Sequence, residues 1–148
     1  MTAPRKAIMG AVAAALAGVA TARDGSFERN RLDKFLPAEL PGYVLWDGGH
    51  EVEGIDTGGA QRALTLDVDV FVTAATGDAL SDAIADEAAA VTAALLSDVT
   101  LGGVAWDVRE AAMTDPDYSR EGHSLVAEFA LRFVVIYETA SANPDLPA

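Results

Sequence analysis

SLVAEFALRFVVIYE, residues 124–138, is the stretch that decides the fold. Successive side chains of a β-strand point to opposite faces of a sheet, so this stretch is read with a period of two. One face is then apolar throughout, at Leu125, Ala127, Phe129, Leu131, Phe133, Val135 and Tyr137. The other face is polar at Glu128 and Arg132 and turns apolar at Val134 and Ile136. The pattern predicts one long, half-buried strand whose second face is covered at its far end.

A second run of the same kind covers residues 61–73 and predicts the sheet partner of the first strand. Its apolar face carries Leu64, Leu66, Val68, Val70 and Val72. Shorter strands are predicted at 27–31, 43–47 and 104–113, the last with Val104, Trp106 and Val108 facing inward. The Gly-rich segment 48–60 is predicted to be a loop or a loose hairpin, and the polar segment 115–122 is predicted to be a loop.

Two further segments show the helical spacing of apolar residues, 4–20 and 78–96, with Thr2 and Asp78 as their predicted caps. The order of elements predicts an α+β fold with a mainly antiparallel sheet of four to five strands and two helices packed on one face. The length fits a single domain, residues 1–138, followed by a flexible C-terminal tail, residues 139–148. The chain has no cysteine, so neither a disulfide nor a thiolate zinc site is possible.

The net charge of −13 is unevenly distributed. Residues 1–34 contain six basic and three acidic side chains, whereas the rest of the chain contains four basic and twenty acidic ones. The acidic body disfavours direct nucleic-acid binding, because it repels phosphate. The polarity suits contact between a basic segment of one copy and the acidic body of the next, and it equally suits a solvated surface that keeps the protein soluble.

The N-terminal segment leaves a targeting question open. Arg5 and Lys6 precede an Ala-rich run, residues 7–20, and the triplet 20–22 has the A-x-A form of a secretory cleavage site. The run is poor in Leu and Phe, contains Gly10 and Gly18, and is shorter than the roughly twenty residues of a membrane span. We therefore favour a helix of the folded domain with no membrane association.

The inventory of catalytic residues is small. His50 and His123 have no second ligand at metal-binding spacing, and Ser124 lacks the G-x-S-x-G elbow of a nucleophilic serine. Asp67 and Asp69 share one strand face about 7 Å apart, a spacing that acid/base pairs and metal sites use. Cross-strand ion pairing or a subunit contact explains them together with Asp107, Arg109, Glu128 and Arg132 on the same face. We predict no catalytic, cofactor-binding or metal-binding residue and no enzyme activity. The least favoured alternative is a cytoplasmic carboxylate or metal enzyme that uses Asp67 and Asp69.

Four stretches taken in order carry a family resemblance: LTLDVDVFVTA, DALSDAIADEAAAVTAALLSD followed by LGGV, MTDPDYSREG, and FALRFVVIYET. In this succession the chain resembles the tail terminator proteins of long-tailed bacteriophages, the lambda-type minor tail protein U group. The shared features are a strand ending in V-F-hydrophobic, an acidic-started helix, a small-residue turn, a charged D-Y-x-R loop, and a last strand closing on a Tyr-Glu pair. The likeness covers most of the chain except residues 22–60.

The resemblance implies a structural virion protein without a cofactor. It would form a hexameric ring at the head-proximal end of the phage tail, stop polymerisation of the tail-tube protein, and present a docking surface to the head-completion or neck protein. Assembly would take place in the host cytoplasm. The second alternative is another neck or connector ring protein of the virion.

Ring closure needs two different surfaces of one subunit, which directs attention to exposed charged residues. On physical grounds we predict the following interface residues: Arg29, Arg31, Lys34, Asp67, Asp69, Arg109, Tyr118, Arg120 and Arg132.

Overall fold

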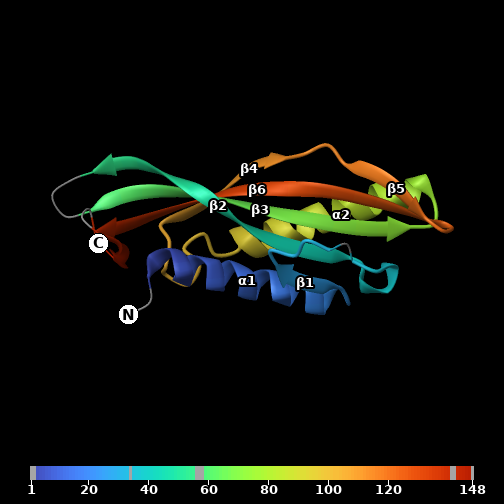
Figure 1. The fold of residues 1–148 in the computed structure, drawn as a ribbon, viewed down its shortest axis with the longest axis horizontal. Coiled ribbons are helices and arrows are strands. Elements are labelled where there is room, and N and C mark those ends of the chain that lie inside the picture. Colours follow the sequence, from blue (N-terminus) through green and yellow to red (C-terminus); the bar gives the residue numbers. More distant parts are fainter. Residues whose placement is uncertain (1–2, 34, 56–58, 141–142, 148) are drawn as a thin grey trace.

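The computed structural model describes residues 3–33, 35–55, 59–140 and 143–147. These described residues form two α-helices, a short 3-10 helix and seven strands (Figure 1). In chain order the elements are α1 (Pro4–Ala22), β1 (Ser26–Arg29), η1 (Pro37–Glu39), β2 (Gly42–Ile55), β3 (Ala60–Ala74), α2 (Gly77–Leu96), β4 (Asp107–Met113), β5 (Asp117–Glu121), β6 (Ser124–Ala140) and β7 (Asn143–Pro147).

All seven strands belong to one sheet, in the order β1-β2-β3-β6-β4, with β5 and β7 also paired to β6. Only β1 and β2 run parallel; the other strand pairs are antiparallel. The predicted α+β class is confirmed, and the sheet has more strands than the four to five predicted. The additional strands are short, so they contain too few residues to show a period of two.

Strand β6 is the central element, as the opening stretch predicted. It pairs with β3 along its length and with β4 and β5 on its other edge. Its seven predicted apolar positions face the helices, and six of them are buried while Leu125 is partly buried. The pairing register places Leu131 opposite Val68 and Phe133 opposite Leu66, so the inner faces of the two long strands form one surface.

Both helices pack on that inner face, as predicted, and Figure 1 shows α2 behind the long strands and α1 below them. Helix α1 buries Ile8, Val12 and Leu16 in the same core to which α2 contributes Val91 and Leu95. Each such side chain contributes about 1.5–3 kcal/mol when it leaves water. Sheet and helices are therefore held by a single apolar layer.

Helix α1 is long and apolar enough to span a membrane by length and composition alone, so our argument that it is too short for a span was wrong. The observation that assigns it to the folded domain is instead the burial of Ile8, Val12 and Leu16 against the sheet. Ala3 occupies its cap position, and Thr2, the predicted cap, lies outside the described residues. Helix α2 is capped by Thr76, whose hydroxyl accepts the Ala79 N–H, rather than by the predicted Asp78.

Of the two forms predicted for 48–60, a loop or a loose hairpin, the structure has the hairpin: β2 continues to Ile55 and pairs antiparallel with β3, which begins at Ala60. Two bulges interrupt the pairing, one between Asp47 and His50 and one between Val52 and Gly54. At the first bulge two glycines oppose the single residue Thr65. A Cβ on Gly48 would stand 1.9 Å from the Thr65 carbonyl oxygen, so the glycine is what lets the two backbones approach.

Three other predictions along the chain need correction. Strand β4 begins only at Asp107, so Trp106 lies before it and is 56% exposed, and only Val108 of the three predicted inward residues is buried. Residues 117–121, predicted as loop, form β5, which turns into β6 at Gly122 in the left-handed region with φ 62°. The predicted flexible tail also differs: β6 extends to Ala140, and Asn143–Pro147 pairs with its end. Strands β5 and β7 are held by backbone hydrogen bonds to β6, and the polar composition of these segments does not predict such pairing.

Candidate interaction surface

The outer face of the sheet, opposite the helices, gathers four of the predicted interface residues. The register pairs Asp67 with Arg132 and aligns Arg109 with Val134, two residues further along β6. Asp69 stands two residues from Asp67 on β3, so it shares the same face. The sequence prediction that these four charged side chains lie together is confirmed.

Asp67 and Arg132 form the cross-strand ion pair that the alternation predicted. The Arg132 guanidinium donates from Nε to Asp67 Oδ1 at 2.9 Å and from Nη2 to Oδ2 at 3.2 Å. This two-fold contact raises the pKa of Arg132. Both side chains are partly exposed, at 55% and 35%, so the pair is screened by solvent and orients the two groups more than it stabilises the fold.

Asp69 has a different partner, although it neighbours Asp67 on the strand. Its Oδ2 accepts a hydrogen bond from Trp46 Nε1 at 2.9 Å. Burial raises the pKa of Asp69, against the opposing effect of the Trp46 hydrogen bond. The two aspartates are thus held by separate partners, and no group of three or more His, Cys, Asp or Glu in the described part of the chain could hold a metal ion.

The predicted basic segment is largely engaged within the subunit. Arg31 pairs with Glu28 at 3.0 Å and with Glu39 at 3.5 Å, and its guanidinium carbon lies 4.3 Å from the centre of the Phe35 ring. Arg29 approaches Asp47 at 3.6 Å with 44% of its side chain exposed. Lys34 lies outside the described residues. Arg31 therefore holds the 35–40 segment in place. Of Arg29 and Arg31, only Arg29 is exposed to a neighbouring molecule at the β1 edge.

The remaining predicted residues, Tyr118 and Arg120, lie at the same edge of the sheet as Arg109, opposite β1. Tyr118 and Arg120 are exposed on β5, where the register pairs them with Ala127 and Leu125. These partners face the helices, so Tyr118 and Arg120 belong to the helix side of the sheet and are separated from the outer-face charges. Arg109 on β4 pairs with Asp107 at 2.8 Å and is 65% exposed.

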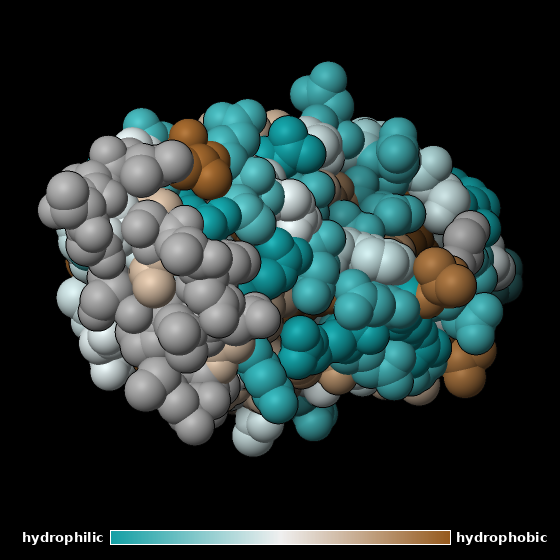
Figure 2. All heavy atoms as spheres, turned by 60° about the vertical axis from the view of Figure 1, so that its left-hand side comes forward, coloured by the Kyte–Doolittle hydropathy of each residue, from teal (hydrophilic) through white to brown (hydrophobic). Residues whose placement is uncertain are grey.

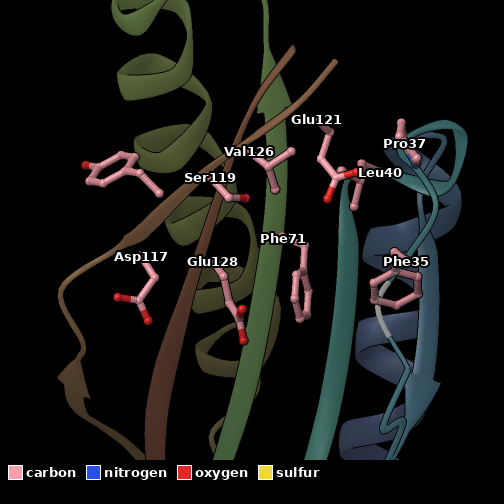
Figure 3. A pocket seen from close by; sticks show the side chains of 10 residues that line it. Phe35, Pro37, Leu40, Phe71, Asp117, Ser119, Glu121, Val126 and Glu128 are labelled. Carbon is pink, nitrogen blue, oxygen red and sulfur yellow. The ribbon is translucent and has the colours of Figure 1, made fainter. Parts of the chain in front are cut away.

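A groove on the outer face was missed by the sequence analysis. It lies between the 35–40 segment and β5, with a volume of about 170 Å³ (Figure 3). Phe35 and Phe71 form an edge-to-face pair on its one side, with ring centres 5.4 Å apart, and Val126 contributes to the other. The signal in the sequence was Phe71 itself, an aromatic residue on the otherwise polar face of its strand.

The coloured part of the face in Figure 2 is mostly hydrophilic, with separate hydrophobic side chains. Eight described large hydrophobic residues are exposed: Leu32, Leu36, Val52, Val99, Val104, Trp106, Met113 and Tyr118. Leu32 and Leu36 lie in the connection between β1 and η1, and Val99, Val104 and Trp106 lie in the connection between α2 and β4, while the other three lie on β2, β4 and β5. The groove combines apolar side chains with a concave shape. A second concave surface, between α1 and α2, is lined by small apolar side chains that include Ala15, Val19 and Ala94.

A buried polar network connects the helices to the sheet and was also missed. Glu87 of α2 is 6% exposed and accepts hydrogen bonds from the Tyr43 hydroxyl and from Arg23 Nε, the latter at 2.6 Å. Burial, together with the Glu87 carboxylate, raises the pKa of Tyr43. A second cluster joins Arg62 to Thr139 Oγ1 at 2.8 Å and to His50 Nε2 at 2.7 Å. Both clusters join separate elements and have a structural role.

The Tyr43 network predicts a loss of stability at high pH. The folded-state pKa of Tyr43 lies above its unfolded value of about 10, so the folded state holds this proton more tightly. The stabilisation is fully present below about pH 10 and is lost as pH rises above it, by up to about 1.4 kcal/mol per pH unit for one proton. Urea unfolding between pH 8 and pH 11 measures this slope.

Tyr43→Phe is the control for that experiment, because it removes the titrating hydroxyl and leaves the ring. Tyr137, whose pKa burial also raises, contributes a slope of the same sign, so we expect the variant to keep a weaker pH dependence. An identical slope in the variant and the parent protein would contradict the assignment to Tyr43.

Comparison with known proteins gives evidence about the fold. No protein-family model matches the chain, and no curated protein matches it. One solved structure, whose name states no function, is 19% identical, with 87% of this chain and 93% of that chain covered and a TM-score of 0.51. At this identity the likeness shows a shared fold alone. A chain from the virion of a native gene transfer agent particle is 16% identical over 84% of this chain and 91% of that chain, but its TM-score of 0.30 is too low to support an argument.

Proposed function

We propose that this chain is a non-enzymatic structural protein of a phage virion, and more narrowly a tail terminator that forms a ring on the head-proximal end of the tail tube. The observation that carries the proposal is where the resembling stretches lie in the fold. They fall in chain order on β3, α2, the connection into β5 with β5 itself, and β6. The resemblance therefore follows one continuous set of packed elements rather than scattered segments.

The shape of the sheet supports assembly into a closed ring. A ring of identical subunits needs two different surfaces that meet head to tail. The sheet ends in β1 on one side and in β4 and β5 on the other. Arg29 is exposed beside the first edge, and Tyr118, Arg120 and Arg109 are exposed beside the second. Each subunit thus offers two unlike edges, and the charged outer face lies between them.

Light scattering coupled to size-exclusion chromatography, with and without tail-tube protein, tests the proposal. We expect a species of six times the 15.3 kDa chain mass, either alone or on tubes. Electron microscopy of growing tubes is expected to show that the protein halts their elongation. A chain that stays strictly monomeric and never caps tubes would contradict the terminator function, and a ring that ignores tubes would favour the neck or connector alternative.

A charge swap tests whether the outer face is a subunit contact. Arg132→Glu removes both hydrogen bonds to Asp67, whereas the double variant Asp67→Arg/Arg132→Glu allows the ion pair to form again with its direction reversed. If neighbouring subunits touch this pair, both variants lower the fraction assembled while circular dichroism shows an intact fold. Full recovery of assembly in the double variant would limit the pair to a role within its own sheet.

A further inference from the structure

The outer-face groove has the dimensions of a single aromatic side chain. Its volume is about 170 Å³, and a cavity of about 150 Å³ accommodates a benzene ring. Small-molecule sites are usually larger, at about 300–1,000 Å³. Phe35, Phe71 and Val126 give it apolar walls, and Figure 3 shows the Phe71 ring between Glu128 and Phe35. The size and lining thus match one inserted ring better than a free ligand.

The rim of the groove is acidic. Asp117 and Glu121 stand on β5 and Glu128 on β6, and all three line the groove (Figure 3). Asp117 and Glu121 are exposed, and none of the ion pairs within the described residues involves either of them. Their charge therefore remains available to a cation from outside the subunit. The matching occupant carries lysine or arginine beside its aromatic ring.

A second copy of this chain is a poor source of such a segment. Its exposed Tyr118 and Arg120 lie on β5 beside exposed Asp117 and Glu121, which would bring two more carboxylates to the acidic groove. The chain has a net charge of −13, and its basic side chains are mostly engaged within the subunit: Arg23 with Glu87, Arg31 with Glu28, and Arg132 with Asp67. Two copies therefore repel each other at an acidic groove. A different, basic protein has the complementary charge.

We propose that this groove binds a segment of a partner protein in which one aromatic side chain is flanked by lysine or arginine. The ring fills the space beside Phe71, and the flanking cations meet Asp117 and Glu121. This inference stands on the groove alone and holds whether or not the chain forms a ring.

Saturation-transfer NMR tests the proposal, because it observes the peptide and suits weak binding to an assembly of any size. The probe is acetyl-Lys-Gly-Trp-Gly-Lys-amide, compared with one peptide carrying Ala for Trp and one carrying Glu for both Lys. We expect saturation to concentrate on the indole protons, with a dissociation constant on the order of 1 mM. Both comparison peptides are expected to bind at least tenfold more weakly.

Variants of the protein locate the site. Ser119 is an exposed residue lining the groove, so Ser119→Trp fills the groove without disturbing the core and is expected to abolish binding. Asp117→Lys/Glu121→Lys is expected to weaken binding at least threefold. Asp82→Lys/Glu110→Lys changes the net charge equally at exposed positions outside the groove and is expected to leave binding unchanged.

Three results would overturn the proposal. The peptide could bind Ser119→Trp as well as it binds the parent protein, which would place it elsewhere. The two double variants could weaken binding equally, which would reduce the effect to net charge. Finally, Ser119→Trp could dissociate an assembly of the parent protein in light scattering, which would make a second copy the occupant.

Discussion

Replacing Gly48 by alanine is expected to lower the free energy of unfolding by about 2–3 kcal/mol. The added Cβ would meet the Thr65 carbonyl oxygen at 1.9 Å and its carbonyl carbon at 2.8 Å. Both are backbone atoms of β3, a strand paired on both sides, so no side-chain rotation relieves the contact. Either the bulge opens or β2 moves away from β3. Urea unfolding at neutral pH measures the loss, and a fall of roughly 4–12 °C in Tm accompanies it.

Gly49→Ala is the matched control, one residue along the same bulge. A Cβ there meets no atom within 4 Å. Both substitutions reduce the freedom of the unfolded chain in the same way, which by itself stabilises by about 0.4–1 kcal/mol. We expect Gly49→Ala to be neutral or slightly stabilising. Equal stabilities for the two variants would show that the bulge does not require the close backbone approach at Gly48.

Glu87→Ala is expected to cost about 3 kcal/mol of unfolding free energy. The substitution leaves the Tyr43 hydroxyl, on a fully buried side chain, without its acceptor, and it removes the carboxylate that Arg23 contacts at 2.6 Å. An unsatisfied buried hydroxyl costs about 1–3 kcal/mol, and hydrogen bonds to a charged group contribute about 1.5–3 kcal/mol. Because Arg23 is 35% exposed, the larger share of the loss falls on the Tyr43 bond.

Asp86→Ala provides the control, because Asp86 is the exposed neighbour of Glu87 on the same helix and the substitution removes the same charge. It is expected to change stability by less than about 0.5 kcal/mol. A double-mutant cycle between Glu87→Ala and Tyr43→Phe is expected to give a coupling of about 1–2 kcal/mol. Strict additivity of the two substitutions would mean that the hydroxyl and the carboxylate do not act together.

The charged outer face was predictable because it follows from alternation within single strands. The period of two placed Asp67, Asp69 and Arg132 on one face, and the register then set Asp67 directly opposite Arg132. The alternation of side chains along a strand could not show which residue each charged side chain contacts. Trp46 of β2 reaches Asp69, and Asp107 takes Arg109 on its own strand, because these pairings depend on which strands are neighbours and on side-chain reach.

By itself, the sequence determined the two long strands, both helices and the α+β class, because each of these elements repeats its apolar spacing over enough residues to define a face. Tertiary structure alone decided the rest. The sequence leaves a loop and a loose hairpin both open at Gly48 and Gly49, and the backbone of Thr65 explains why glycine continues the strand there. Residues 117–121 have the composition of a loop, and they form a strand because the edge of β6 pairs with them. The groove likewise exists only because the 35–40 segment folds over Phe71 from another part of the chain. A short range of sequence records local periodicity, whereas close approach and long-range pairing exist only between segments that the fold brings together.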